Sequence, residues 1–163
     1  MKDFNAPGFL RILTEKFPHQ PTVKQGLALN KLANFVLEGK KDDVFLLKGF
    51  AGTGKTTLVA TLVSSLWKVK MSSVLMAPTG RAAKVMSVYS GNKAFTIHKK
   101  IYFPKKQSGG GIQFVLAPNK HRNTVFIVDE ASMIPDAPSD SKLFENGSLL
   151  DDFYTCCVSH GYC

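Results

Sequence analysis

The stretch that decides the fold is Gly49-Phe50-Ala51-Gly52-Thr53-Gly54-Lys55-Thr56, which fits the pattern G-x-x-x-x-G-K-[ST]. Its three glycines let the backbone wrap closely, so that successive N–H groups point into one concavity. An apolar run at residues 44–47 precedes it, and apolar side chains at helical spacing follow it over residues 56–67. A strand buried on both faces, a glycine-rich turn and a helix, in that order, predict a phosphate-binding loop.

The parts of this loop have distinct expected roles in binding a nucleoside triphosphate, which we expect to be ATP with Mg²⁺. Lys55 supplies a mobile cation for the β- and γ-phosphates, and the Thr56 hydroxyl is a magnesium ligand. The helix that begins near Lys55 adds its positive N-terminal end. The residues expected to bind the nucleotide are Gly49, Gly52, Thr53, Gly54, Lys55, Thr56 and Thr57.

Strands and helices alternate along the rest of the chain, which is typical of a parallel α/β sheet. Residues 22–38 carry a helical apolar stripe, with Thr22 as a cap and Gly39 as an end signal. Residues 74–77 and 124–128 are expected to be buried strands.

A helix over residues 81–89, capped by Thr79, is expected to follow the strand at 74–77. Residues 102–123 interrupt the alternation. Their aromatic and β-branched segments at 102–106 and 112–116 flank a glycine-rich tip, which favours a hairpin. A disordered surface loop is the alternative.

Two carboxylates follow the strand at 124–128 directly. The carboxyl ends of parallel strands form the edge where ligands of open α/β sheets bind. We therefore expect Asp129 to hold magnesium, through water, and Glu130 to act as general base for the attacking water. An acidic pair after a strand is weak evidence alone, and the phosphate loop gives it weight.

Composition points to a globular protein with a basic body. The net charge is +9, and residues 1–128 hold 20 Lys and Arg against five Asp and Glu. This excess suits a polyanion, although it also serves solubility. No apolar run approaches the ~18 residues that span a bilayer, and the start lacks signal-peptide features, so a cytoplasmic protein without membrane contact is expected.

All three cysteines lie in the last eight residues of the chain. An odd number confined to a tail is not a disulfide framework. Cys157, His160 and Cys163 are a weak zinc candidate, because a structural zinc site needs a fourth ligand.

Four segments in order, GFAGTGKTT, APTGRAAKVMS, FTIHKKI and VFIVDEASMI, give the chain a family resemblance over residues 20–150. It resembles the first half of a superfamily 1 DNA helicase of the RecD-like (Dda-like) group. The resemblance implies a P-loop NTPase fold, in which helices flank a RecA-like parallel sheet. It also implies ATP-driven translocation on single-stranded DNA, typically 5′ to 3′.

The resemblance assigns DNA contacts to two segments, namely Pro78, Thr79 and Arg81 in the first and Thr96 and His98 in the second. Thr79 and the N–H groups at a helix start suit a phosphate. The alternatives are a solvated helix residue for Arg81 and a structural role for His98. The hairpin at 102–116 stands where some relatives carry a strand-separating pin, and Phe103, Lys105, Lys106 and Phe114 suit nucleic acid.

Gln25 has two competing interpretations. In the family, a glutamine at this place reads the adenine edge through its amide. Thr22-Val23-Lys24-Gln25 is also a capping box, in which the glutamine bonds back to the start of its own helix. We expect the adenine contact.

The chain departs from the family pattern after the acidic pair. The family adds a further central strand, a Gly-Asp-x-x-Gln type motif and a second motor domain with arginines, and none is recognisable here. We therefore interpret residues 1–150 as a first RecA-like ATPase domain and residues 151–163 as an atypical tail without useful periodicity. A truncated or frame-shifted product is expected, with a natural short form as the alternative.

Three function classes follow from these patterns. The first is the ATP-binding motor domain of a DNA helicase, which binds ATP weakly and does not unwind DNA alone. The second is a nucleotide-binding module without catalysis. The third, another phosphate-loop enzyme such as a nucleotide kinase, lacks a recognisable acceptor-binding lid.

Overall fold

The computed structural model describes residues 5–40, 42–107, 109–135 and 148–158. The chain divides into two compact units. The helical unit holds Met1–Ser73 with Tyr89–Gly91, and the sheet unit holds Val74–Val88 with Asn92–Cys163. The phosphate loop lies in the helical unit, and the acidic pair lies in the sheet unit.

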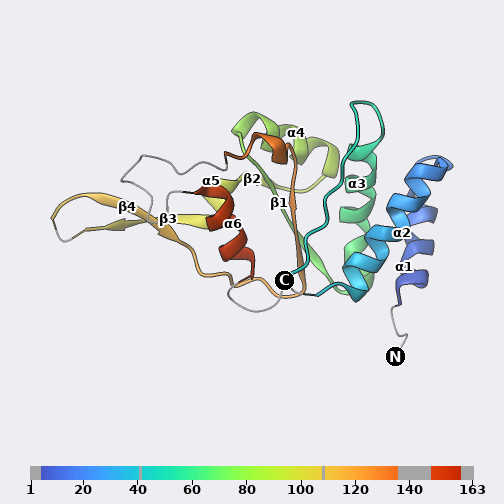
Figure 1. Ribbon diagram of the computed structural model, residues 1–163, viewed down its shortest axis with the longest axis horizontal. Coiled ribbons are helices and arrows are strands. Elements are labelled where there is room, and N and C mark those ends of the chain that lie inside the picture. The colour runs from blue at the N-terminus through green and yellow to red at the C-terminus, as the bar shows by residue number, and fades with distance from the viewer. Residues whose placement is uncertain (1–4, 41, 108, 136–147, 159–163) are drawn as a thin grey trace. The chain divides into compact units, whose positions relative to one another are not determined.

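Three helices that contact one another build the helical unit (Figure 1). They are α1 (Ala6–Lys16), α2 (Val23–Glu38) and α3 (Lys55–Ser65), and the 3₁₀ turn η1 (Leu66–Val69) follows α3 directly. Helix α2 confirms the predicted helix, with Thr22 as N-cap and Gly39 as C-cap. The apolar stripes of the helices supply the buried side chains of this unit, which include Phe9, Leu13, Leu29, Leu32, Leu58 and Leu62.

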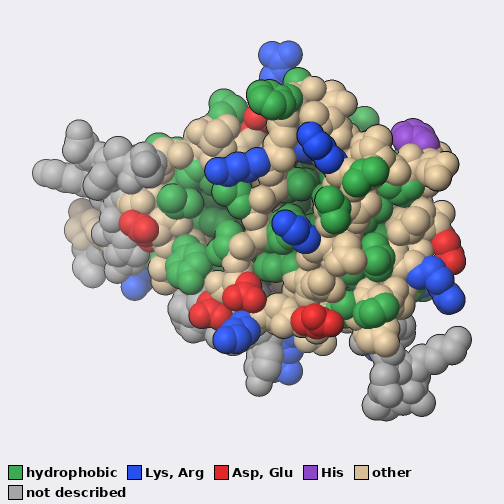
Figure 2. Space-filling model, turned by 45° about the vertical axis from the view of Figure 1, so that its right-hand side comes forward, with side chains coloured by type: hydrophobic (Ala, Val, Ile, Leu, Met, Phe, Trp, Pro, Cys, Tyr) green, Lys and Arg blue, Asp and Glu red, His purple; other side chains and the backbone are tan. Residues whose placement is uncertain are grey.

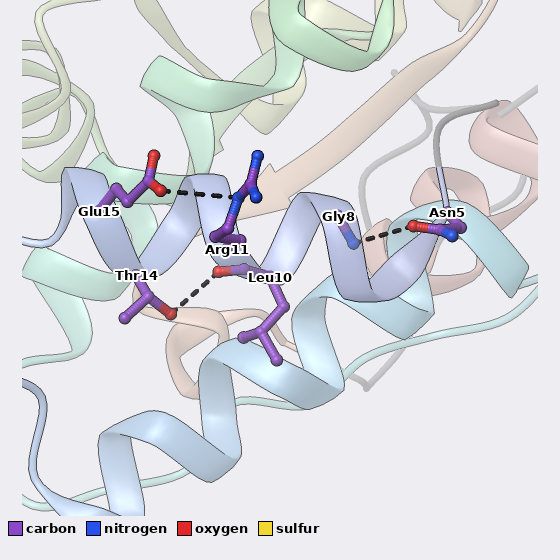
Figure 3. Close-up of polar contacts among 6 residues, drawn as sticks. All are labelled: Asn5, Gly8, Leu10, Arg11, Thr14 and Glu15. Carbon is purple, nitrogen blue, oxygen red and sulfur yellow. Dashed lines mark hydrogen bonds and ion pairs between the residues drawn. The ribbon is translucent and has the colours of Figure 1, made fainter. Parts of the chain in front are cut away.

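Helix α1 is an element that the sequence patterns had not suggested. Asn5 caps it by accepting a hydrogen bond from the Gly8 N–H at 2.9 Å. Figure 3 shows this cap, together with an exposed Arg11–Glu15 ion pair at 3.6 Å and a Thr14 hydroxyl bonded to the Leu10 carbonyl. An Asn before a first-turn proline is a start signal, so the helix was detectable in the sequence.

The predicted strand at residues 44–47 is wrong. The segment belongs to no strand, and Val44 and Leu46 are 75% and 64% exposed, although Phe45 packs against Phe35. Among the described residues, none forms a backbone hydrogen bond with residues 44–48. Apolar β-formers make a strand only when a neighbouring strand supplies ladder partners, and no such partner lies among the described residues.

A three-stranded sheet in the order β2-β1-β5 forms the centre of the sheet unit. Strand β1 (Ser72–Ala77) pairs in parallel with β2 (Ala94–Thr96), and β5 (Thr124–Val128) lies on its other side. Helix α4 (Gly80–Ser90) connects β1 to β2, and helix α5 (Ile97–Ile101) follows β2 directly. This arrangement confirms the predicted α/β class with a parallel sheet and helices.

The predicted hairpin is confirmed. Strands β3 (Tyr102–Lys106) and β4 (Ile112–Leu116) pair antiparallel over five residue pairs, from Tyr102–Leu116 to Lys106–Ile112. At the tip, the Gln107 N–H donates to the Gly111 carbonyl at 2.9 Å, and Gly110 has φ 88°. Figure 1 shows the paired strands as an arm of the sheet unit.

The view that residues 151–163 lack useful periodicity is wrong where the structure describes them. Helix α6 (Leu149–Val158) packs Leu149, Phe153 and Cys156 against the core around Val74, Met76 and Ile97. Asp152 falls on the same face and hid the apolar stripe. Asp152 as a whole residue is 1% exposed, and its carboxylate accepts a hydrogen bond from the Tyr102 hydroxyl. Burial, followed by this bond and the Asp152 charge, raises the pKa of Tyr102 well above its usual range.

The surface mixes charged and apolar side chains. On the face drawn in Figure 2, Lys and Arg lie between hydrophobic side chains and near Asp and Glu. Within the described ranges, no helix is both long and apolar enough to cross a bilayer. The same residues contain no group of three potential metal ligands, and the predicted zinc candidates His160 and Cys163 lie outside them.

Candidate functional site

The loop at residues 49–56 requires glycine at defined positions. Gly52 and Gly54 have φ values of 76° and 88°, in the left-handed region that favours glycine. A Cβ on Gly49 would lie 2.7 Å from the Thr53 hydroxyl oxygen, and one on Gly54 would lie 2.6 Å from Gln25 Nε2. Conformation and close approach thus explain the glycine spacing of the motif.

Lys55 closes the loop upon itself. Its Nζ donates to the carbonyl oxygens of Gly49 and Phe50 at 2.5 and 2.9 Å. The Thr53 hydroxyl donates to the same Phe50 carbonyl at 2.8 Å. These bonds hold the ammonium group against the turn, where its charge can reach an anion bound by the loop.

The start of helix α3 offers further donors. Gly54 is its N-cap and contributes no side-chain cap. No described residue accepts a hydrogen bond from the N–H groups of Lys55, Thr56 or Thr57. Thr56 is exposed and Thr57 half-buried. Free N–H groups, the positive helix end and the Lys55 ammonium fit a phosphate chain, and the Thr56 hydroxyl fits a magnesium ligand.

Gln25 joins helix α2 to this loop. Its Oε1 accepts from the Thr22 N–H at 3.0 Å, and the Thr22 hydroxyl accepts from the Gln25 N–H at 3.3 Å, which completes the capping box. Its Nε2 donates to the Thr53 carbonyl at 3.3 Å. The capping interpretation is confirmed, while adenine contact stays a prediction. The bond to Thr53 was absent from either interpretation.

The acidic pair follows β5, as predicted. The half-buried Asp129 donates its N–H to the Met76 carbonyl at 3.0 Å, which extends the β5–β1 ladder by one residue. Its Oδ1 accepts from the Glu130 N–H at 2.9 Å. Glu130 is exposed, has φ 53° and begins the 3₁₀ turn η2 (Ala131–Met133). A left-handed non-glycine residue is unusual and often marks a functional turn.

The two predicted DNA segments each begin a helix in the sheet unit. The Thr79 hydroxyl accepts from the Ala82 N–H at 3.2 Å at the start of α4, where Pro78 is half-buried and Arg81 exposed. The Thr96 hydroxyl accepts from the Lys99 N–H at 3.3 Å at the start of α5. Both threonine hydroxyls therefore act as acceptors that cap helices, which leaves the O–H of each able to donate to a phosphate.

The second segment lines a pocket of about 450 Å³. The His98 and Tyr102 rings lie 5.9 Å apart, and partial burial lowers the pKa of His98. Three of its lining residues, Lys99, Tyr102 and Pro104, were not among the predicted DNA contacts. The pocket also includes Phe114, the hairpin residue that was expected to suit nucleic acid. The basic run His98–Lys100, followed by Tyr102 and Phe103, was the available signal. The lining residues are Thr96, His98, Lys99, Tyr102, Pro104 and Phe114.

Two comparisons with known proteins agree with these features. A family model described as an AAA domain matches residues 34–148, which is more than half of the chain. The ATP-dependent DNA helicase dda of Enterobacteria phage T4 is 33% identical over 102 residues, which cover 61% of this chain and 22% of that helicase. The chain thus spans less than a quarter of the length of that relative. Given the loop, the sheet and these matches, the chain belongs to the AAA domain family and is a superfamily 1 helicase-like domain.

Proposed function

We propose that this chain is the ATP-binding motor domain of an ATP-dependent DNA helicase. The observation that carries the proposal is the loop at residues 49–56. Its left-handed glycines, the Lys55 ammonium and the N–H groups at the start of α3, which bond to no described residue, form a site for a phosphate chain. ATP and Mg²⁺ are the proposed ligands, with Lys55 on the phosphates and Thr56 on the metal.

In this proposal Asp129 holds Mg²⁺ through water and Glu130 orients the attacking water. The half-buried Asp129 carboxylate is fixed by the Glu130 N–H, whereas the Glu130 side chain is exposed at a sheet edge. A fixed carboxylate suits metal binding, and an exposed one is accessible to a water molecule that it could orient. The phosphate loop precedes the acidic pair in this chain, as it does in the family that the chain resembles. This shared order supports the proposal that both motifs act on one nucleotide.

Single-stranded DNA is the proposed partner of the sheet unit. Arg81 is an exposed cation at the start of α4, and the pocket beside α5 combines Lys99 and His98 with the rings of Tyr102 and Phe114. Cations bind phosphates, and aromatic rings stack on bases without regard to sequence.

A nucleotide-binding module without catalysis is the second candidate. It is favoured by residues 44–48, which lead into the loop without a ladder partner among the described residues. A loop whose leading segment lacks sheet support holds its donors less firmly, so we propose weak ATP binding and no unwinding by this chain alone.

An ATPase assay with and without single-stranded DNA separates the two candidates. The motor predicts turnover that DNA stimulates, and a Glu130→Gln chain that still binds ATP without hydrolysing it. Binding without turnover in the unaltered chain would favour the module. If Glu130→Gln turned over ATP as fast as the unaltered chain, the role of Glu130 would be wrong.

A salt titration tests the DNA contact. Arg81→Ala should weaken single-stranded DNA binding and reduce the slope of log affinity against log salt by roughly one. Lys84→Ala is the matched control, because Lys84 is also an exposed cation of α4. Equal slopes for both variants would remove Arg81 from the proposed interface.

A further inference from the structure

The amide of Gln25 is committed at both ends. Its oxygen accepts from the Thr22 N–H at 3.0 Å, and its nitrogen donates to the Thr53 carbonyl at 3.3 Å. Only one orientation of the amide satisfies both partners, because an N–H needs an acceptor and a carbonyl needs a donor. The half-buried side chain therefore bridges the first turn of α2 and the loop.

The contact falls on the Thr53–Gly54 peptide, which leads into a left-handed glycine. Gly54 has φ 88°, and a Cβ there would lie 2.6 Å from Gln25 Nε2, so the amide nitrogen sits against the Gly54 backbone. The carbonyl and N–H of a trans peptide point in opposite directions. Holding the Thr53 carbonyl toward Gln25 therefore turns the Gly54 N–H to the opposite side of that peptide.

We propose that Gln25 is a positioning residue for the phosphate chain, which acts through the Thr53–Gly54 peptide. The inference rests on the proposed function of the loop. It follows that the contribution of Gln25 to binding affinity should not depend on the base. It should be equal for every triphosphate, whether or not it carries adenine. Contact with the adenine edge, the family expectation, predicts the opposite.

Gln25→Glu isolates the bond to the loop. A glutamate still accepts from the Thr22 N–H, because Thr-x-x-Glu is a capping box, but it has no N–H to give the Thr53 carbonyl. The new charge is matched by Lys24→Gln, which changes the net charge equally at the neighbouring exposed position. Thr22→Ala removes part of the cap and leaves Nε2 in place.

The probes are ATP, GTP and inorganic tripolyphosphate, each with Mg²⁺, titrated by calorimetry into the full 163-residue chain. We expect Gln25→Glu to weaken the binding of all three probes by a similar factor, roughly three- to tenfold for the loss of one hydrogen bond. Lys24→Gln should account for a smaller part of this loss. Thr22→Ala should lower the melting temperature and leave the three affinities close to those of the unaltered chain.

Two results would overturn the inference. In the first, Gln25→Glu weakens ATP but leaves GTP and tripolyphosphate unchanged, which would make Gln25 a reader of the base. In the second, Gln25→Glu and Lys24→Gln lose the same affinity for each of the three probes. The change in net charge alone would then explain the loss.

Nitrogen relaxation measurements on the free protein separate this inference from the proposed function. The amides of residues 52–54 should have lower order parameters in Gln25→Glu than in the unaltered chain, and equal values would overturn the inference. If the unaltered chain bound none of the three probes, the proposed function would fall, and this measurement would decide the inference alone.

Discussion

Residues 44–48 and the hairpin strands have a similar sequence character and different structures. Val44-Phe45-Leu46-Leu47-Lys48 is as apolar and β-prone as Ile112–Leu116, yet only β4 joins a ladder. Strand β4 finds its partner a few residues away, across the tip that Gln107 and Gly111 close at 2.9 Å. Strand propensity is thus a property of a segment, whereas a strand is a property of a pair.

Hydrogen exchange gives the largest expected difference between the two regions. The N–H groups of the β3–β4 ladder should be protected at least roughly tenfold relative to those of residues 44–48, because the latter bond to no described residue. Amide exchange followed by mass spectrometry or NMR measures both regions in one sample. Equal protection would show that residues 44–48 pair in solution.

The base of the hairpin should be sensitive to Tyr102→Phe. This change removes one hydrogen bond from the carboxylate of Asp152, a residue that is 1% exposed. We expect the free energy of unfolding to fall by about 1–3 kcal/mol. Tyr154→Phe is the control, since Tyr154 is an exposed tyrosine on the same helix α6 and should change stability by less than ~0.5 kcal/mol. Equal denaturation midpoints for both variants would contradict the role of the Tyr102–Asp152 bond.

Residues 44–48 should tolerate polar substitution on their outer side. Leu46 is 64% exposed, so Leu46→Ser should change the free energy of unfolding by no more than ~0.5 kcal/mol. Phe45→Ala should lower the free energy of unfolding by more than Leu46→Ser does, because the Phe45 ring packs against the Phe35 ring at 5.4 Å between centroids. Urea unfolding ranks the two variants. A larger loss for Leu46→Ser would mean that its side chain is buried in solution.

The smallest expected effect is a loss of stability in acid. Burial lowers the pKa of His98, and burial with the Lys100 charge lowers that of His121, from the ordinary 6.5. The folded state then binds fewer protons than the unfolded state, so stability is complete above about pH 6.5 and falls as the pH drops below it. The effect is small because both side chains are only partly buried. Urea midpoints at pH 7.5 and 5.5 measure it, and a His98→Gln, His121→Gln double variant should flatten the change. If the urea midpoint of the double variant fell as much between pH 7.5 and 5.5 as that of the unaltered chain, this assignment to the two histidines would be contradicted.

Local signals explain what the sequence could predict. The loop glycines, the Thr22 cap and the hairpin tip depend on residues within a few positions of one another, and each appears in the structure as expected. Strand β5 and the acidic residues after it were equally readable, because an apolar run that ends in two carboxylates is a local pattern.

Non-local partners explain what the sequence could not predict. Helix α6 was missed because Asp152 interrupts its apolar face, and the partner that permits its burial, Tyr102, lies 50 residues away. Residues 44–48 were misread because no pattern within them shows whether a neighbouring strand exists. The Gln25–Thr53 bond spans 28 residues and was likewise absent from the motif.

Nucleotide binding by a Lys55→Ala chain tests the central claim most directly. Lys48→Ala is the matched control, because Lys48 is an exposed lysine just before the loop, whereas Lys55 Nζ bonds to the loop carbonyls. Calorimetric titration with Mg²⁺ and ATP should show a loss of affinity of roughly ten- to a hundredfold for Lys55→Ala, the range for hydrogen bonds to a charged group, and little change for Lys48→Ala. If Lys55→Ala bound ATP as tightly as the unaltered chain, residues 49–56 would not be the triphosphate site.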